Sequence, residues 1–222
     1  CIRDSAVIIP AHNEAEYLPR CLEAVLIAAG AAETAGHRVE IVVVLDRCND
    51  ASASIAARYP VSVLEVDARN VGQARRAGVA MMLERGADWL ACTDADSCVP
   101  AQWLLCQLGF AADVVCGTVH IDQWQAVQDS ALRERYLSRY QNREDHRHIH
   151  GANLGICARA YLRAGGFQPL ALNEDVELIN ALQASGARIV WTARNSVSTS
   201  SRLDSRARGG FGDYLRSLAG AN

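Results

Sequence analysis

The sequence predicts an α/β fold in which helices flank one central, mostly parallel sheet. Short apolar runs alternate with amphipathic runs through the first hundred residues, and this alternation is typical of βαβ units. The apolar runs are nearly continuous and rich in valine and isoleucine, as expected of strands covered on both faces. The chain has 222 residues, half of them hydrophobic, so it is long enough to enclose one large core.

Strands and helices follow one another regularly only in the first half. There the sequence predicts strands at 6–10, 39–45, 61–66 and 89–93, and helices at 14–30, 53–59 and 72–86. In the less regular second half we expect strands at 114–119, 154–157 and 189–191, and helices at 158–164 and 174–185. Residues 1–222 are therefore expected to form one domain, with 200–222 as a flexible lid or tail.

Polar side chains follow each of the first four predicted strands, at the point where the strand ends. They are His12, Asn13 and Glu14, then Asp46 and Asp50, then Asp67, Arg69 and Asn70, and finally Asp94 and Asp96. Ligands of open parallel sheets gather at the carboxyl ends of the strands. We therefore expect a binding site at this edge, in preference to a merely solvated edge.

The triplet Asp94-Ala95-Asp96 comes directly after the strand at 89–93. Two carboxylates at positions i and i+2 can both approach a divalent cation, and hard oxygen ligands suit Mg or Mn. Such an ion neutralises the charge that builds up on a departing diphosphate. The same Asp-x-Asp pattern also occurs in turns whose aspartates are solvated. The prediction of a metal site therefore depends on the position of the triplet after a buried strand.

Composition and charge exclude several classes of protein. The net charge of -3 does not favour binding to nucleic acid. The eight cysteines contain no CxxC pair, which favours reduced thiols in the cytoplasm over disulfides or a zinc site. His146, His148 and His150 are interpreted as part of a polar loop rather than zinc ligands. No apolar run reaches the roughly 18 residues of a membrane span, and no signal peptide is visible, so the protein is expected in the cytoplasm or at the periphery of a membrane.

The segment Val7-Ile8-Ile9-Pro10-Ala11-His12-Asn13-Glu14 resembles the opening of family 2 glycosyltransferases. Further matches follow in the order of that family, across about residues 6–200. They are Asp46, Arg69-Asn70-Val71-Gly72, the acidic triplet, Gly151-Ala152-Asn153, and Glu174-Asp175. The resemblance implies the GT-A fold, with a single Rossmann-like sheet, a nucleotide-binding half at about 1–100 and an acceptor-binding half at about 101–200.

The resemblance also implies an activity, which is transfer of a sugar from a UDP- or GDP-linked donor to a hydroxyl group. It implies Mg or Mn as the cofactor and a small molecule or a lipid-linked glycan as the acceptor. Asp96 would bind the metal directly, and Asp94 would contact the metal or the ribose. The expected nucleotide-binding residues are Pro10, Ala11, His12, Glu14, Asp46, Arg69, Asn70, Arg75, Asp94 and Ala95.

The acidic pair Glu174-Asp175 opens a predicted helix. In the related enzymes the aspartate of such a pair takes the proton from the acceptor hydroxyl, so Asp175 is the expected general base and Glu174 its support. A base opposite the leaving group implies a single displacement with inversion. The alternative is that both carboxylates only favour a helix N-terminus. Gly151, Ala152 and Asn153 are expected to line the acceptor or sugar region, with an ordinary loop as the alternative.

The C-terminal segment departs from the family pattern. Many relatives place a metal-binding histidine here, whereas the sequence after Val190 contains none, and the QxxRW motif of processive members is also absent. Arg202, Arg206 and Arg208 are expected to grip the donor diphosphate, because arginine forks match phosphate oxygens. A basic tail without a role is the alternative.

Two other functions stay open at this point. A nucleotidyltransferase also carries metal-binding carboxylates on a parallel sheet, but it would have a glycine-rich basic loop where His12-Asn13-Glu14 stands. A non-catalytic module that binds nucleotide-sugars would keep Asp46 and Asp96 and would not need a base at Asp175.

Overall fold

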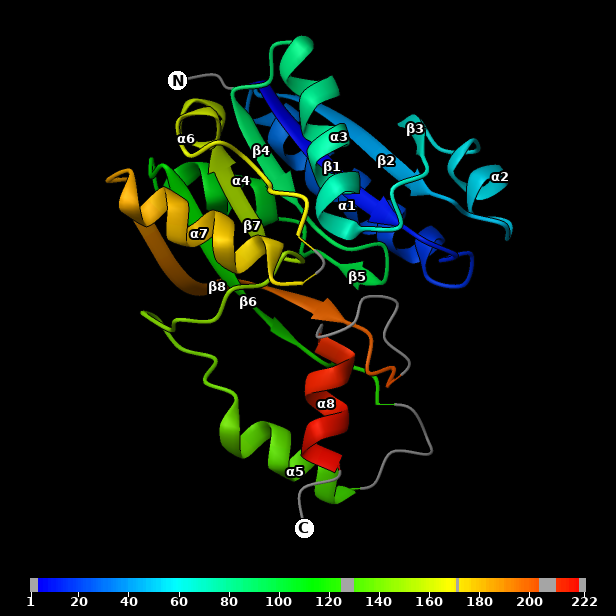
Figure 1. Ribbon diagram of the computed structural model, residues 1–222, viewed down its shortest axis with the longest axis vertical. Helices are drawn as coiled ribbons and strands as arrows, with labels where there is room; N and C mark the ends of the chain where they lie inside the picture. The colour runs from blue at the N-terminus through cyan, green and yellow to red at the C-terminus, as the bar shows by residue number, and fades with distance from the viewer. Residues whose placement is uncertain (1–3, 125–129, 171, 204–210, 220–222) are drawn as a thin grey trace.

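The computed structural model describes residues 4–124, 130–170, 172–203 and 211–219. Within these residues, one eight-stranded sheet has the order β3-β2-β1-β4-β7-β6-β8-β5 (Figure 1). The strands are β1 (Asp4–Ala11), β2 (Arg38–Asp46), β3 (Ser62–Val66), β4 (Trp89–Cys92), β5 (Ser97–Cys98), β6 (Val114–His120), β7 (Leu154–Cys157) and β8 (Ile189–Thr199). The predicted α/β class with a single central sheet is confirmed.

The sheet is parallel in its first half and mixed in its second. β1 lies between β2 and β4, parallel to both, and β3 extends this half parallel to β2. β7 runs antiparallel to β4 and to β6, and β5 runs antiparallel to β8. Because β1 to β4 run in one direction, the polar residues after these strands lie at one edge of the sheet.

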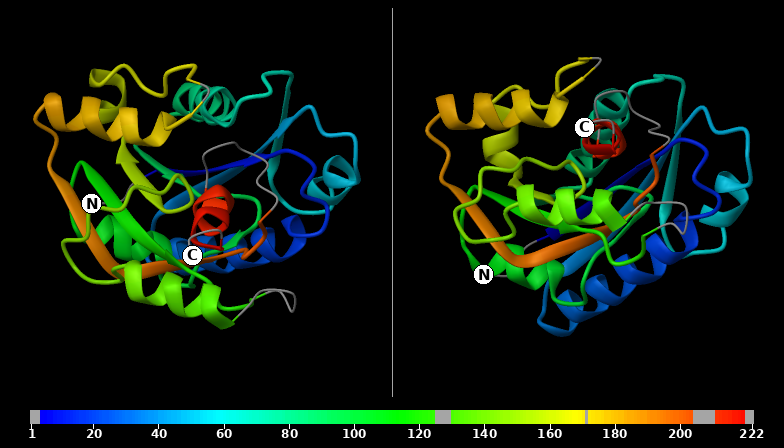
Figure 2. Two further views of the ribbon diagram at one scale, coloured as in Figure 1. Left: turned by 60° about the horizontal axis from the view of Figure 1, so that its bottom comes forward. Right: turned by 90° about the horizontal axis from the view of Figure 1, so that it is seen from below.

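Helices cover both faces of the sheet, as Figure 2 shows. Successive side chains of β1 enter two separate cores, since Val7 and Ile9 face α1 and α4 whereas Ala6 and Ile8 face α3, α6 and α7. The helices are α1 (Leu18–Thr34), α2 (Ser52–Ala56), α3 (Val71–Glu84), α4 (Trp103–Gly109), α5 (Ser130–Arg139), α6 (Ala158–Arg163), α7 (Glu174–Ala184) and α8 (Phe211–Ala219). This burial of both faces explains the continuous apolar strands of the sequence.

The first helix begins later than the sequence pattern predicts, at Leu18 rather than at residue 14. Pro19 lies in its first turn, where the missing proline N–H costs no hydrogen bond. Residues 14–17 form a separate turn closed by the N–H of Tyr17 on the carbonyl of Glu14 at 3.0 Å. Glu14 is therefore placed at the carboxyl end of β1, outside the helix.

The last strand is much longer than predicted. β8 continues to Thr199, because its polar second part pairs with β6 and then with β5. The predicted strand ended at residue 191 because the apolar pattern ends there. The observed strand continues to Thr199, and Ser200 and Arg202 follow directly after it. The short strand β5 and the helix α4 were likewise not predicted.

Helices α5 and α8 form a small layer of their own beside the sheet (Figure 1). Leu132 and Tyr136 of α5 pack with Leu215 and Leu218 of α8. Residues 211–219, within the segment expected to be a lid or tail, thus form a packed helix, while Arg206 and Arg208 lie outside the described residues. None of the described helices has the length and apolarity needed to cross a bilayer. The seven described cysteines are free thiols.

The three alternating histidines lie in a loop, as the sequence predicted, and their rings form a stack. His148 stacks on Tyr140 at 4.3 Å between ring centroids, and on His146 at 5.5 Å. The ring of His150 bonds the hydroxyl of Tyr140 at 2.9 Å, and that hydroxyl accepts the N–H of Val119 at 2.9 Å. Burial lowers the pKa of all three imidazoles, that of His150 to about 3.

The histidine stack predicts a loss of stability in acid. The folded protein holds His150 neutral, whereas an unfolded chain protonates histidine near its ordinary pKa of about 6.5, so stability is lost as the pH falls below that value. His150→Gln should reduce the drop in unfolding free energy between pH 7.5 and pH 5 by about 1–2 kcal/mol. Urea unfolding at the two pH values measures this. His37→Gln, outside the stack, is the control, and an equal drop in His150→Gln and the parent would contradict the prediction.

Candidate active site

The polar residues after β1, β2 and β3 contact one another, as the sequence predicted. His12 Nδ1 lies 2.6 Å from the carbonyl oxygen of Asp46. The buried Asp46 carboxylate accepts the backbone N–H groups of Ala68, Arg69 and Asn70 at 2.8, 2.9 and 2.8 Å. Asp46 therefore orders the loop between β3 and α3, and its expected contact with a nucleotide base stays a proposal.

Several loops at this edge adopt the left-handed backbone conformation. Asn13 has a φ of 55°, Arg47 of 52°, Arg69 of 49° and Asn173 of 58°. Asparagine tolerates this region, but for arginine it is uncommon and costs free energy. Such residues cluster at functional sites, where the surrounding structure holds the strained backbone in place. The sequence contains no signal for the strain at the two arginines.

Asn70 has two structural roles at the start of α3. Its Oδ1 accepts the N–H of Gln73 at 2.8 Å, which is a helix N-cap. Its Nδ2 donates to the carbonyl of Leu170 at 2.6 Å, which connects the loop to the segment before α7. The neighbouring Arg69 and the more distant His12 are exposed, so these two predicted nucleotide-binding side chains are open to a ligand.

Arg75 of α3 links two acidic segments from inside the protein. Its side chain is 4% exposed, Nη2 lies 2.5 Å from Asp94 Oδ1, and Nη1 bonds Glu174. A Cβ added at Gly151 would collide with the guanidinium, so glycine is needed there for packing. The guanidinium of Arg75 is buried between these two carboxylates, and its predicted contact with a phosphate stays a prediction. Burial raises the pKa of Glu174, and Arg75 opposes that effect.

Asp175 lies in the first turn of α7 and is partly buried. Its Oδ2 accepts the N–H of Gly151 at 2.9 Å, and its Oδ1 accepts the N–H of Val176 at 2.8 Å. A carboxylate at the N-terminus of a helix can serve as a general base for an acceptor hydroxyl. The same contacts fit the alternative role of a helix-end carboxylate, so the contacts alone do not separate the two.

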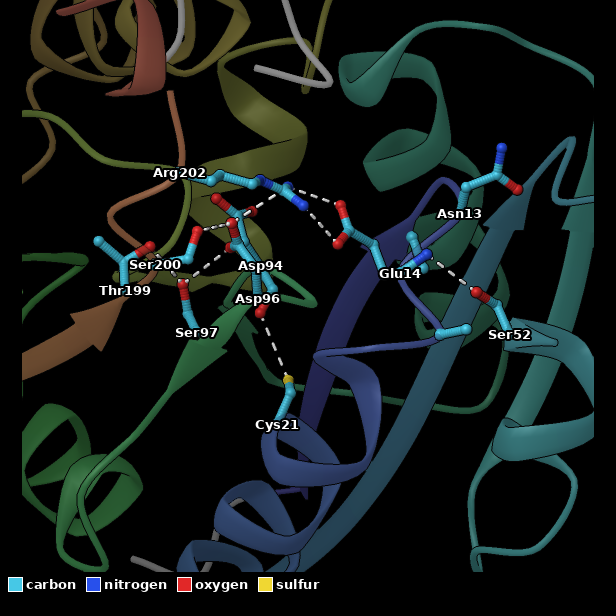
Figure 3. A network of polar contacts seen from close by, with 12 residues as sticks. Asn13, Glu14, Cys21, Ser52, Asp94, Asp96, Ser97, Thr199, Ser200 and Arg202 are labelled. Carbon is cyan, nitrogen blue, oxygen red and sulfur yellow. Dashed lines mark hydrogen bonds and ion pairs between the residues drawn. The ribbon is translucent and has the colours of Figure 1, made fainter. Parts of the chain in front are cut away.

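Arg202 forms a second set of contacts, which Figure 3 shows. Its Nη1 and Nη2 donate to the two carboxylate oxygens of Glu14 at 2.7 and 2.6 Å. Its Nη2 also lies 3.1 Å from Asp96 Oδ2, which accepts the hydroxyl of Ser200 at 2.7 Å. Burial raises the pKa of Asp96, and Arg202 opposes this effect. The sequence prediction placed Glu14, Asp96 and Arg202 in one site, and the structure brings them together.

Asn153 is buried inside the protein, and its predicted place in the acceptor or sugar region stays a prediction. Its side chain is fully buried, and its Nδ2 donates to the carbonyls of Thr118 and Asn195, both at 2.8 Å. Its Oδ1 accepts the indole N–H of Trp103 at 2.9 Å. Asn153 therefore joins β6, β8 and α4, and these contacts fit the alternative of an ordinary structural loop.

The small predicted residues are also buried. Pro10, Ala11, Ala95 and Ala152 lie beneath the loops of the site. Their side chains pack inside the protein, so any contact they make with a nucleotide uses their backbone atoms.

Ser200 and Tyr17 belong to the site and were not predicted to. Ser200 was missed because the predicted strand stopped before it. Tyr17 faces Arg202, whose guanidinium carbon lies 5.4 Å from the centre of the tyrosine ring. A cavity of about 260 Å³ lies beside these residues and is bordered by Asp96 and Trp124, so Asp96 lies next to space that a ligand can enter.

The donor atoms fit a divalent cation that arrives with a diphosphate. Asp94, 35% exposed, and Asp96 offer carboxylate oxygens. Within the described residues, no group of three or more acidic, histidine or cysteine side chains is arranged to hold an ion. Mg²⁺ is commonly bound by one or two carboxylates with substrate phosphates and water completing the shell. The two aspartates therefore suit an ion shared with the substrate rather than an all-protein cage.

Solved structures of two glycosyltransferases are similar to the chain. Residues 1–349 of Staphylococcus aureus TarS in complex with UDP-GlcNAc align with a TM-score of 0.68 and 16% identity, covering 94% of this chain and 61% of that one. The mannosyltransferase PcManGT from Pyrobaculum calidifontis, in complex with GDP-Man and Mn²⁺, aligns with a TM-score of 0.67 and 17% identity, covering 89% and 57%. The chain thus spans about three fifths of the length of these structures and has the GT-A fold.

Sequence comparison gives the family. No curated protein sequence matches the chain. The family model described as glycosyl transferase family 2 matches residues 6–164, which include β1, the acidic triplet and the Arg75 segment. The protein is therefore a member of glycosyl transferase family 2.

Proposed function

We propose that the protein transfers a sugar from a UDP- or GDP-linked donor to a hydroxyl group of an acceptor, with Mg²⁺ or Mn²⁺ bound at Asp96 and Asp94. The observation that carries this proposal is a cluster of charges at the carboxyl ends of β1 and β4. Among the residues that the structure describes, Glu14, Asp94, Asp96 and Glu174 form ion pairs with two arginines there, Arg75 and Arg202. Four carboxylates against two guanidinium groups leave a net charge of -2 when all are ionised, which suits a divalent cation.

Each residue of the site has a separate role in the proposed reaction. The bound cation would neutralise the negative charge that develops on the leaving nucleoside diphosphate. Asp94 and Asp96 supply oxygen ligands, and Arg75 keeps Asp94 in place. Asp175, at the N-terminus of α7, takes the proton of the acceptor hydroxyl as that oxygen attacks the anomeric carbon. A single displacement of this kind inverts the anomeric configuration.

The proposed acceptor is a small molecule or a lipid-linked glycan. Nucleotide-sugar binding is supported by the similar solved structures, which are complexes with UDP-GlcNAc and with GDP-Man. The non-catalytic module is the remaining alternative. It would bind the same donors but would have no use for a base at Asp175.

A panel of nucleotide-sugars tests the proposal. With Mn²⁺, one UDP- or GDP-linked donor at about 100 times its Kd should stabilise the protein by about 2.7 kcal/mol. In a protein of this size the melting temperature then rises by roughly 5–10 °C. EDTA or Asp96→Asn should remove the rise, and free nucleoside diphosphate should accumulate only with Mn²⁺. If no donor shifts the melting temperature, the proposal fails; binding without turnover on any acceptor would favour the module.

A further inference from the structure

Arg202 contacts Asp96, the residue proposed to bind the metal. Its guanidinium is 16% exposed and contacts Glu14 through both amino groups. Nη2 is shared, since it also faces Asp96 Oδ2 at 3.1 Å (Figure 3). Glu14 therefore binds both amino groups of the Arg202 guanidinium, whereas Asp96 contacts one of these groups at a longer distance.

Asp96 Oδ2 has two partners, both of them from the segment that follows β8. Ser200 donates to it at 2.7 Å, and Arg202 approaches it from the side of Glu14. Among the described residues, Asp96 Oδ1 has one contact, at 3.3 Å with the hydroxyl of Ser97. A divalent cation that binds Oδ2 would lie close to the guanidinium, and two cations within a few ångströms repel each other strongly in a partly buried site.

We propose that Arg202 is an exchangeable counter-cation, which neutralises Asp96 before the donor binds and is displaced from Asp96 by the cation that the donor diphosphate carries. The inference rests on the proposed function, since it assumes a diphosphate donor. Arg202 remains beside the site through Glu14, and its guanidinium then bonds the diphosphate, whose oxygens match the arginine fork. Arg202 is thus a positioning residue that couples metal binding to donor binding.

The exchange has a consequence that a fixed salt bridge does not share. If Arg202 competes with the metal, the ion alone binds weakly and binds well only together with a diphosphate. Removing the guanidinium charge then strengthens binding of the ion alone and weakens binding of the diphosphate. If Arg202 only connects the segment after β8 to Glu14, its removal makes the Asp96 side chain less well positioned. The affinity for the metal ion then stays unchanged or falls.

Titration of Mn²⁺ followed by electron paramagnetic resonance separates these outcomes without any measurement of turnover. In Arg202→Gln, the affinity for Mn²⁺ alone should rise about tenfold, and the affinity for UDP or GDP in saturating Mn²⁺ should fall about tenfold. Arg202→Lys keeps the charge and should retain the weak binding of Mn²⁺ alone. An affinity for Mn²⁺ alone that is unchanged or lower in Arg202→Gln overturns the inference.

Two further variants serve as controls. Arg85→Gln removes an exposed arginine that pairs with Glu40 away from the site, and it should change neither affinity. Asp96→Asn should lose Mn²⁺ binding. If Asp96→Asn loses it and Arg202→Gln shows no higher affinity for Mn²⁺ alone, the displacement of Arg202 by the metal is wrong and the proposed metal site stands. If Asp96→Asn keeps Mn²⁺, the proposed metal site itself is wrong. Thermal unfolding verifies that each variant is folded, and Arg202→Met, which also removes the charge, carries the test if Arg202→Gln is not.

Discussion

Asp175→Asn is expected to lower kcat by about 10²–10⁴-fold, the range associated with loss of a general base, while donor affinity stays nearly unchanged. Asparagine keeps an oxygen that can accept the N–H of Gly151, so the contact between α7 and the loop survives. What it loses is the ability to take a proton. Single-turnover transfer from the donor found in the nucleotide-sugar panel, combined with calorimetric titration of that donor, measures both quantities.

Glu177→Gln is the matched control for this variant. Glu177 is an exposed carboxylate in the same first turn of α7, so its loss changes the helix-end charge without touching the site. If Asp175→Asn and Glu177→Gln transfer sugar at the same rate as the parent, Asp175 only stabilises the helix end. A bell-shaped or sigmoidal pH profile that disappears in Asp175→Asn would support the base role independently of the rate.

Arg75→Met should lower the free energy of unfolding more than any other variant proposed for this protein, by about 3–5 kcal/mol. The substitution leaves buried carboxylates without the guanidinium that neutralises them. Glu174 is buried and Asp94 partly so, and both contact the guanidinium. Methionine fills much of the side-chain volume, so the effect comes mainly from charge. Urea unfolding at pH 7.5 measures it, and Arg85→Met, which breaks the exposed pair with Glu40, should cost less than about 1 kcal/mol.

The pH dependence of this loss has a defined sign. Burial already raises the pKa of Glu174, and Arg75 opposes that rise, so removing Arg75 raises the pKa further in the folded state. The unfolded chain ionises Glu174 at its ordinary, lower pKa, and the variant therefore loses stability as the pH rises above that value. The difference between the variant and the parent should shrink toward pH 4–5. A difference independent of pH would mean that packing, rather than charge, carries the effect.

The first half of the fold follows closely from local sequence pattern. Runs such as Val42-Val43-Val44 can only be buried on both faces, and the intervening amphipathic runs supply the helices that cover them. Parallel strands then bring the residues after each strand to one edge, which is why the site could be located without a structure. One exception at this edge is the start of α1, which begins at Leu18 with Pro19 in its first turn. Glu14 therefore lies outside the helix, where it pairs with Arg202.

The second half depends on contacts that no local pattern reveals. β8 is polar beyond residue 191 and becomes a strand because β6 and β5 pair with it. Asn153 was expected to line the acceptor or sugar region, and it is buried by Trp103 and Asn195. Burial of a polar side chain depends on partners from distant segments, so its sequence neighbours do not predict it.

The sequence by itself determined the α/β class, the family resemblance and the edge of the sheet where the acidic residues meet, because burial periodicity and the alternation of strands with helices are local properties of the chain. Only the tertiary structure decided how those charges are paired. Glu14 and Arg202 are 188 positions apart in the sequence, and Arg75 and Glu174 are 99 positions apart. The free energy of such pairs depends on the burial and separation of both groups in the folded chain, which residue type and spacing do not specify.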